Sequence, residues 1–194
     1  MKTKRLVAIL SITGASLWAD QSAKPQNGVV TVCMDSAPSV RMGVRPLASA
    51  MFARIGVTVE WRERASCPVG IGAVQVRLSH GSPGIHHSEA LAFAIPRQAT
   101  IVVFVDAVHK SNHDGLPSVM AHVLVHEITH VLEGFDRHSA TGIMKARWDY
   151  QDFCEMRRKP IPFAQEDVNL IHDRLKVPRV ASATAFTRVA VAGP

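Results

Sequence analysis

A histidine–glutamate–x–x–histidine pattern lies in the middle of the chain and consists of His126, Glu127 and His130. Residues four apart on a helix lie one turn apart on the same face, so the two imidazoles can reach a single ion. Glu127 lies beside the first imidazole, where its carboxylate can take a proton from a water molecule at that ion. Neutral imidazoles favour zinc, and a catalytic site keeps one position for water. The pattern therefore predicts a site for one Zn²⁺ ion.

A third protein ligand must come from the chain that follows these two histidines. Gly134 can adopt the left-handed conformation that ends a helix, so that the chain can turn back towards the ion. Asp136 and His138 both follow this glycine, and both carboxylate and imidazole bind zinc in proteins. The spacing alone leaves the choice between them open.

The arrangement resembles the zincin metallopeptidases, and among them the metzincins, whose pattern is H-E-x-x-H-x-x-G-x-x-H followed by a methionine turn beneath the metal. This chain has one extra residue before Gly134 and one extra residue between Gly134 and His138. The short path onward to Met144 is most similar to that of the archaemetzincins. The resemblance covers roughly residues 29–176. A strict metzincin register would place the third ligand at Asp136.

We favour His138 as the third ligand and keep Asp136 as the alternative. Imidazole is the commoner zinc ligand, and the longer loop around Gly134 can carry His138 inward. Asp136 could instead orient a ligand imidazole from outside the coordination shell. We therefore expect the His138 ring to lie on the same side as the other two imidazoles, with Asp136 pointing elsewhere.

The resemblance also implies roles for Met144 and Tyr150. Met144 would form a hydrophobic floor under the imidazoles, although an ordinary core methionine would be buried as well. In some metzincins a tyrosine just after the methionine turn stabilises the tetrahedral oxyanion, which makes Tyr150 a catalytic candidate. The alternative for Tyr150 is a structural, packing role, and packing is also what we expect of Trp148.

The activity that the resemblance implies is hydrolysis of peptide bonds by a zinc-activated water, with Glu127 as the general base. The expected partner is a peptide or protein substrate, whose chain would pair with the sheet edge near residues 91–95. A catalytically inactive zinc-binding or interaction protein on the same scaffold is the alternative. Structural zinc does not need a residue such as Glu127, which favours the enzyme.

Hydrophobic periodicity indicates the elements that position these residues. A long, largely apolar helix is predicted over 117–133, with Pro117 in its first turn, and a second helix over 163–175. A third helical pattern lies within 38–56, and 135–162 is predicted to be irregular. Strands are expected at 29–34, 57–61, 72–78, 91–95 and 100–105, with 91–95 at an edge. The predicted fold class is α+β: a metzincin-like zincin fold with a mixed, twisted sheet packed on the long helix, and a C-terminal helix after the methionine turn.

The composition suits a single globular domain. The chain has 194 residues, of which 47% are hydrophobic and 20% charged. No apolar run reaches the roughly 18 residues that a membrane-spanning helix needs, so stable membrane insertion is not expected. Residues 20–178 are the predicted catalytic domain, and 179–194 a loosely ordered tail. The oligomeric state cannot be derived from the sequence.

Residues 1–19 have the character of a secretory signal peptide, with Lys2, Lys4 and Arg5 before a thirteen-residue, mostly apolar stretch. The predicted location is therefore secreted or periplasmic. Removal of this segment would take away three basic residues and no acidic ones, so the net charge would fall from +6 to +3. Such a weak, scattered positive charge does not predict nucleic-acid binding.

Three cysteines, Cys33, Cys67 and Cys154, would allow one disulfide in an oxidising compartment. Cys33 lies in a strand-like segment and is expected to be a buried thiol. Cys67 and Cys154 lie in predicted loops, which makes them the favoured pair.

Overall fold

The computed structural model describes residues 28–35, 40–67, 72–81, 90–111 and 116–176. The predicted signal peptide and the predicted tail over 179–194 lie outside these residues. All the elements discussed below belong to the described part of the chain.

The centre of the fold is a mixed sheet of five strands in the order β2-β1-β3-β5-β4. Its strands are β1 (Gly28–Met34), β2 (Val57–Arg62), β3 (Ala73–Ser79), β4 (Ala92–Ile95) and β5 (Thr100–Phe104). The first four in spatial order are parallel, and β4 runs antiparallel to β5 at the edge. The predicted strands are therefore present within a residue or two, and the predicted edge strand lies at an edge.

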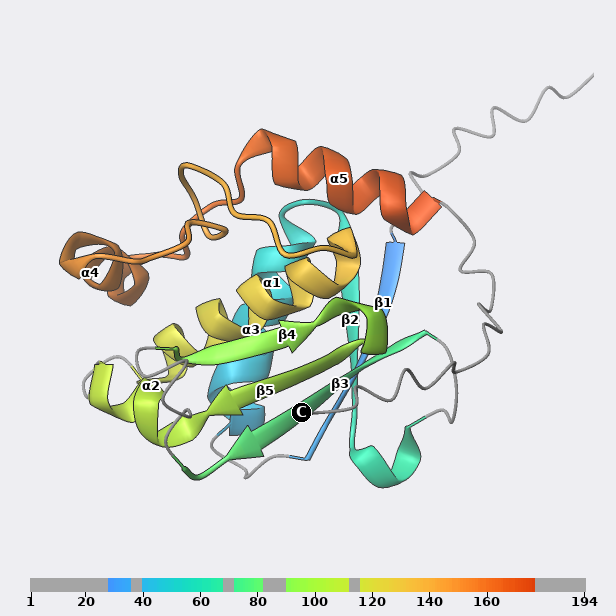
Figure 1. Ribbon diagram of the computed structural model, residues 1–194, viewed down its shortest axis with the longest axis horizontal. Coiled ribbons are helices and arrows are strands. Elements are labelled where there is room, and N and C mark those ends of the chain that lie inside the picture. Colours follow the sequence, from blue (N-terminus) through green and yellow to red (C-terminus); the bar gives the residue numbers. More distant parts are fainter. Residues whose placement is uncertain (1–27, 36–39, 68–71, 82–89, 112–115, 177–194) are drawn as a thin grey trace, which may run out of the picture.

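The long helix α3 (Leu116–Glu133) forms the middle of the hydrophobic core. Every residue from Val119 to Glu133 is buried, because the helix packs against β4, β5 and the helix α1 (Arg45–Ala53). Figure 1 shows α1 and α3 on the same side of the sheet. Gly134 follows α3 with a φ of 82°, the left-handed conformation that favours glycine at a helix end. The predicted helix over 117–133 is thus confirmed.

In the described part of the chain, the helices α5 (Gln165–Lys176) and α2 (Val105–Ser111) also pack around this core. The helix α5 corresponds to the predicted helix over 163–175 and packs on α3 and β1. The helix α2 begins at the last residue of the strand predicted over 100–105 and continues through residues for which no element was predicted. The pattern within 38–56 is helical, but its first turn, Val40–Val44, is a π-helix that leads into α1.

The helix α4 (Tyr150–Arg158) contradicts the prediction that 135–162 is wholly irregular. Its N-terminus is a capping box: the Asp149 carboxylate accepts the backbone N–H groups of Gln151 and Asp152, and the Asp152 carboxylate accepts that of Asp149. The helix has only nine residues, most of them polar, and only Met156 is buried, so it contributes little to the core.

The predicted pairing of Cys67 with Cys154 is wrong. Cys33, near the end of β1, forms a disulfide with Cys67, and their Cα atoms lie 5.9 Å apart. Cys67 follows a short 3₁₀ turn, Arg64–Ser66, that returns the chain after β2 to the neighbouring end of β1. Cys154 lies on α4 and is a free thiol.

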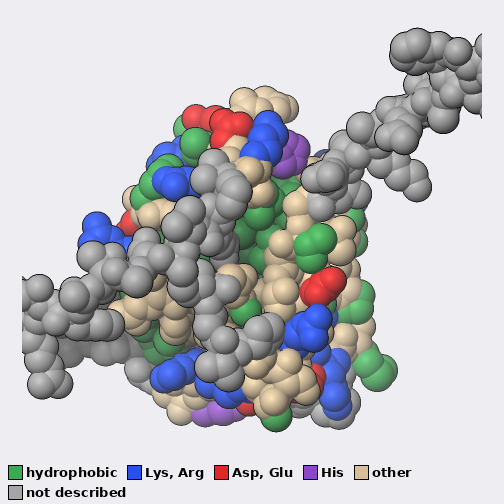
Figure 2. Space-filling view, turned by 90° about the vertical axis from the view of Figure 1, so that its right-hand side faces the viewer, with side chains coloured by type: hydrophobic (Ala, Val, Ile, Leu, Met, Phe, Trp, Pro, Cys, Tyr) green, Lys and Arg blue, Asp and Glu red, His purple; other side chains and the backbone are tan. Residues whose placement is uncertain are grey.

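None of the helices in the described part of the chain is both long and apolar enough to cross a membrane. On the face shown in Figure 2, the described Lys and Arg side chains are scattered among acidic and apolar ones rather than gathered into one patch.

Candidate metal centre

Three imidazoles converge at the C-terminal half of α3. The Nε2 atoms of His126 and His130 lie 3.1 Å apart, close to the roughly 3–4 Å expected of two nitrogens that share one zinc ion. The ring of His138 lies 5.3 Å from that of His126 and 4.9 Å from that of His130, measured between centroids. One ligand atom from each of the three lies within 4.8 Å of the others, so this group could hold a metal ion.

The backbone after the long helix fixes the tautomer of His126. Its Nδ1 lies 2.9 Å from the carbonyl oxygen of Ile143, so Nδ1 carries the proton and donates a hydrogen bond to that oxygen. The lone pair of the ring is then on Nε2, which faces His130. A hydrogen bond of this kind on the far nitrogen is typical of metal-binding histidines. Ile143 is in turn held by its N–H, which donates to the carbonyl of Pro162 at 2.9 Å.

Burial keeps the two helical imidazoles neutral. It lowers the pKa of His126 to about 4, and it lowers the pKa of His130 as well, because a charged ring loses its hydration inside the protein. Neutral imidazole is the form that binds a metal ion. The donor set, its spacing and its protonation therefore fit a zinc ion held by three nitrogens.

Glu127 is a buried carboxyl group in the same pocket as the three imidazoles. Its burial, and then the nearby charge of Asp136, raise the pKa of Glu127 to about 8. A carboxyl group with a raised pKa near a possible metal centre is well suited to accept and release a proton near neutral pH.

Asp136 lies closer to the imidazoles than the sequence predicts. Its Oδ1 is 3.8 Å from Nε2 of His130, whereas we expected its side chain to point elsewhere. The side chain is 83% exposed and does not belong to the group of three histidines. The assignment of His138 rather than Asp136 as the third ligand stays a prediction. The His138 ring does lie beside the rings of His126 and His130.

The pocket around the histidines is bounded by the sheet edge on one side. Its lining includes residues 90–94, which comprise the start of β4, and Trp148 and Phe153 from the segment that contains α4. The pocket has a volume of about 920 Å³. Trp148, expected to be a packing residue, meets the ring of His126 edge-on, with centroids 5.5 Å apart, and also lines the pocket. Sequence periodicity gave no indication of this position, because Trp148 lies outside the helices and strands.

Met144 and Tyr150, the two residues to which the resemblance gave roles, differ in burial: Met144 is buried and Tyr150 is exposed. Met144 is fully buried, as both of its predicted roles require. Tyr150 is the first residue of α4, its side chain is 79% exposed, and it is not among the residues that line the pocket. The structure thus brings His126, Glu127, His130 and His138 together and leaves Tyr150 outside.

Solved structures that resemble this chain were found by structural comparison. The chain is similar to the crystal structure of archaemetzincin from Methanopyrus kandleri, with a TM-score of 0.53 and 15% identity over 77% of this chain and 95% of that one. The archaemetzincin from Archaeoglobus fulgidus, solved in complex with malonate, gives a TM-score of 0.48 and 15% identity over 73% and 98% of the two chains. No protein-family model and no curated protein matches the sequence. At this identity the likeness to the first structure establishes a similar fold.

Proposed function

We propose that this protein is a secreted zinc-dependent metallopeptidase, in which His126, His130 and His138 hold one ion and Glu127 is the general base. The observation that carries the proposal is the position of Glu127, buried in the pocket that the three imidazoles share. A purely structural zinc site needs ligands but no such acid–base group. The archaemetzincin-like fold is consistent with this proposal.

A zinc ion held by the three imidazoles would polarise a peptide carbonyl and promote ionisation of a water molecule. The protein's own residues supply the rest of the chemistry. The carboxylate of Glu127 takes the proton of the attacking water as its oxygen bonds to the carbonyl carbon. The same carboxyl group then delivers that proton to the amine nitrogen as the C–N bond breaks. The carbonyl oxygen of Ile143 accepts a hydrogen bond from the Nδ1–H of His126, which leaves the lone pair on Nε2 available to a metal ion.

The substrate that fits this site is an extended peptide. Among the described strands, β4 pairs with β5 and forms an edge of the sheet. Residues 90–94 line the same pocket as the histidines. A peptide that adds to this edge as a further strand would hydrogen-bond through its backbone and pass the imidazoles. Its main-chain pairing would place a scissile carbonyl without demanding one particular side chain.

Export is the part of the proposal that rests on the disulfide and on residues 1–19. The Cys33–Cys67 bond is of a kind that forms and persists mainly in oxidising compartments. The signal-peptide character of residues 1–19 points to the same compartment. These two features support the proposal of a secreted or periplasmic location.

The test combines metal analysis with peptide cleavage. The purified chain is expected to contain close to one zinc ion per molecule and to cleave peptides from a mixed library. A chelator should abolish cleavage, and added zinc should restore it. Zinc binding without any cleavage would favour the alternative, an inactive zinc-binding protein on this scaffold. Absence of zinc binding would contradict both.

A further inference from the structure

The two chain neighbours of His138 are both tied to one carboxylate. Arg137 donates from Nη2 to Oδ1 of Asp167, and the hydroxyl of Ser139 donates to the same oxygen at 2.5 Å. Arg137 also donates from Nη1 to Ser139 Oγ at 3.2 Å. Asp167 belongs to α5, and its side chain is completely buried, so its carboxylate is shielded from water.

The side chains around His138 alternate in direction. Arg137 and Ser139 reach towards α5, whereas the His138 ring faces the rings of His126 and His130. Neighbouring side chains in an extended segment point to opposite sides of the backbone. Fixing residues 137 and 139 on one side therefore fixes where residue 138 is presented on the other.

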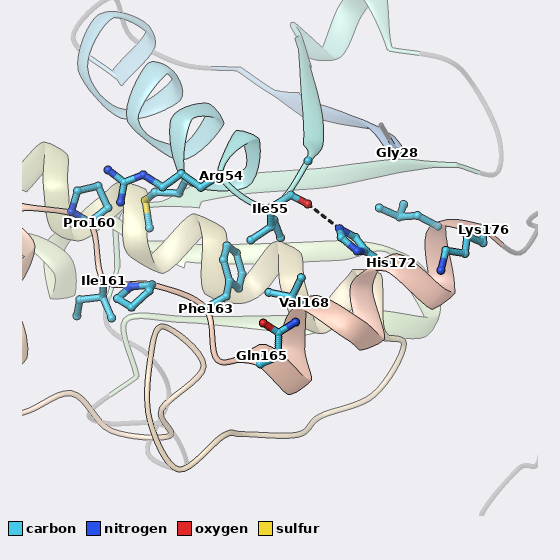
Figure 3. Close-up of a pocket in the computed structure, with 14 residues that line it drawn as sticks. Gly28, Arg54, Ile55, Pro160, Ile161, Phe163, Gln165, Val168, His172 and Lys176 are labelled. Atoms are coloured by element: carbon cyan, nitrogen blue, oxygen red, sulfur yellow. Dashed lines mark hydrogen bonds between the residues drawn. The ribbon is translucent and has the colours of Figure 1, made fainter. Parts of the chain in front are cut away.

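The helix that carries Asp167 is itself firmly held. Ile171 is fully buried, and Nε2 of His172 donates to the carbonyl oxygen of Ile55, at the end of α1, at 2.6 Å. Figure 3 shows this hydrogen bond between α5 and the α1–β2 connection, with Val168 and Phe163 close by. Asp167 also accepts the N–H of Ala164 on Oδ2 at 3.2 Å, which fixes its rotamer at the start of the helix. The position of the Asp167 side chain is therefore fixed by the packing and hydrogen bonds of α5.

We infer that Asp167 is a positioning residue for the metal centre: through Arg137 and Ser139 it holds the loop that presents His138 to the ion. The inference rests on the proposed metal site and adds a residue from α5 to it. Glu133 contacts Arg137 at 3.5 Å, and Glu166, the preceding residue of α5, contacts Arg137 at 3.2 Å and also interacts with Ser139. The Glu166 side chain is exposed to solvent, however, whereas that of Asp167 is completely buried. Asp167 is thus the buried group of α5 that is bonded to both neighbours of His138.

The experiment measures zinc affinity of the full chain by competition with a chromophoric chelator. Asp167→Asn keeps the size of the side chain but removes its charge, and it should weaken zinc binding by about 10–100-fold, as loss of groups that orient metal ligands does. Asp173→Asn is the matched control, because Asp173 lies on the same helix, is exposed and pairs only with Lys176 in the described ion pairs. Its zinc affinity should equal that of the parent.

A double-mutant cycle separates positioning from a general loss of structure. If Asp167 acts through His138, Asp167→Asn should cause no further loss of zinc affinity in a His138→Ala background. The d–d absorption spectrum of bound Co²⁺ should also shift in Asp167→Asn towards the spectrum of His138→Ala. An equal loss of affinity in both backgrounds, or none in the parent background, would overturn the inference.

Ser139→Ala serves if Asp167→Asn does not fold, since it removes one of the two ties and leaves the ion pair intact. It should weaken zinc binding in the parent and not in the His138→Ala background; an unchanged affinity in the parent contradicts the inference.

The outcomes also separate this inference from the proposed function. A parent that binds zinc and cleaves peptides while Asp167→Asn binds zinc equally well refutes only the positioning role. A parent that binds zinc without cleaving refutes only the peptidase.

Discussion

At the residue scale, burial moves the pKa of Glu127 and the pKa values of its neighbouring histidines in opposite directions. It raises the pKa of Glu127 to about 8 and lowers that of His126 to about 4, so both groups are driven towards their neutral forms. A divalent cation among the imidazoles reverses the balance for the carboxyl group, because its positive charge favours the carboxylate. The same burial that keeps the imidazoles ready as ligands therefore makes the ionisation of Glu127 depend on the ion.

The first prediction concerns Glu127. Glu127→Gln preserves the shape of the side chain but cannot accept a proton, so zinc content should stay at the parent level. The value of kcat/KM for peptide cleavage should fall by about 10²–10⁴-fold, the usual contribution of a general base. Metal analysis and peptide hydrolysis on the same preparation check both parts. Glu155→Gln, on the exposed side of α4 where Glu155 pairs with Lys159, is the control and should cleave normally. Cleavage at the parent rate by Glu127→Gln would exclude this residue as the base.

The second prediction concerns the third ligand. His138→Ala should weaken zinc binding strongly, because it leaves two imidazoles where three converge. Asp136→Ala should weaken it by no more than about 10–100-fold, the range for a group that only orients a ligand, since Asp136 Oδ1 lies near His130 in an 83% exposed side chain. Chelator competition on the two variants gives the order of their dissociation constants. The reverse order would assign the third ligand to Asp136.

At the element scale, the site residues that lie on one helix could be placed from the sequence. The positions of those that depend on contacts between separate elements could not. The helix α3 follows from its apolar pattern and from Gly134, and the pattern already places His126 and His130 on one face. The placement of His138 depends on Asp167, a partner on another helix, which no local pattern reveals. The helix α4 is short and mostly polar, but Asp149 and Asp152 at its start are a capping signal that could have been used to predict it.

His122 gives the third prediction, because it joins α3 to the chain that leads into α5. Its Nδ1 donates to the carbonyl of Ser118 at 2.7 Å, and its Nε2 accepts the N–H of Ile161 at 3.0 Å, so the ring is neutral. Burial lowers its pKa below the ordinary 6.5. Below that pH the unfolded chain binds a proton that the folded protein does not, so the free energy of unfolding falls as pH falls, by at most about 1.4 kcal/mol per pH unit from this group.

The measurement is urea unfolding of the chelator-treated protein between about pH 7.5 and about pH 5. His122→Gln should be less stable than the parent at the upper pH, because its two hydrogen bonds are lost or weakened. It should also lose less stability than the parent on acidification. His80→Gln is the control: His80 is an exposed histidine near Asp106, and its removal should leave the pH dependence close to that of the parent. Parallel pH curves for the parent and His122→Gln would contradict the neutral, buried state of this ring.

At the scale of the whole molecule, the two halves of the fold are stabilised differently. Towards β4 the sheet is covered by α3, whose buried residues dominate the core. Towards β2 the chain is also joined covalently, since the Cys33–Cys67 disulfide links β1 to the turn after β2. Neither cysteine lines the pocket of the three histidines. The disulfide is therefore expected to act on global stability and not on the chemistry of the site.

The last prediction follows from this separation. The disulfide spans 34 residues, and closing a loop of that length in the unfolded chain is expected to contribute about 3–4 kcal/mol to the free energy of unfolding. Replacing Cys33 by Ala and Cys67 by Ser together should lower stability in urea by about that amount, whereas Cys154→Ser should change it little, because Cys154 is a free thiol. Zinc affinity, measured at a temperature where the double variant is still folded, should match the parent. A loss of zinc affinity in the folded double variant would show that β1 and the turn after β2 also support the metal centre.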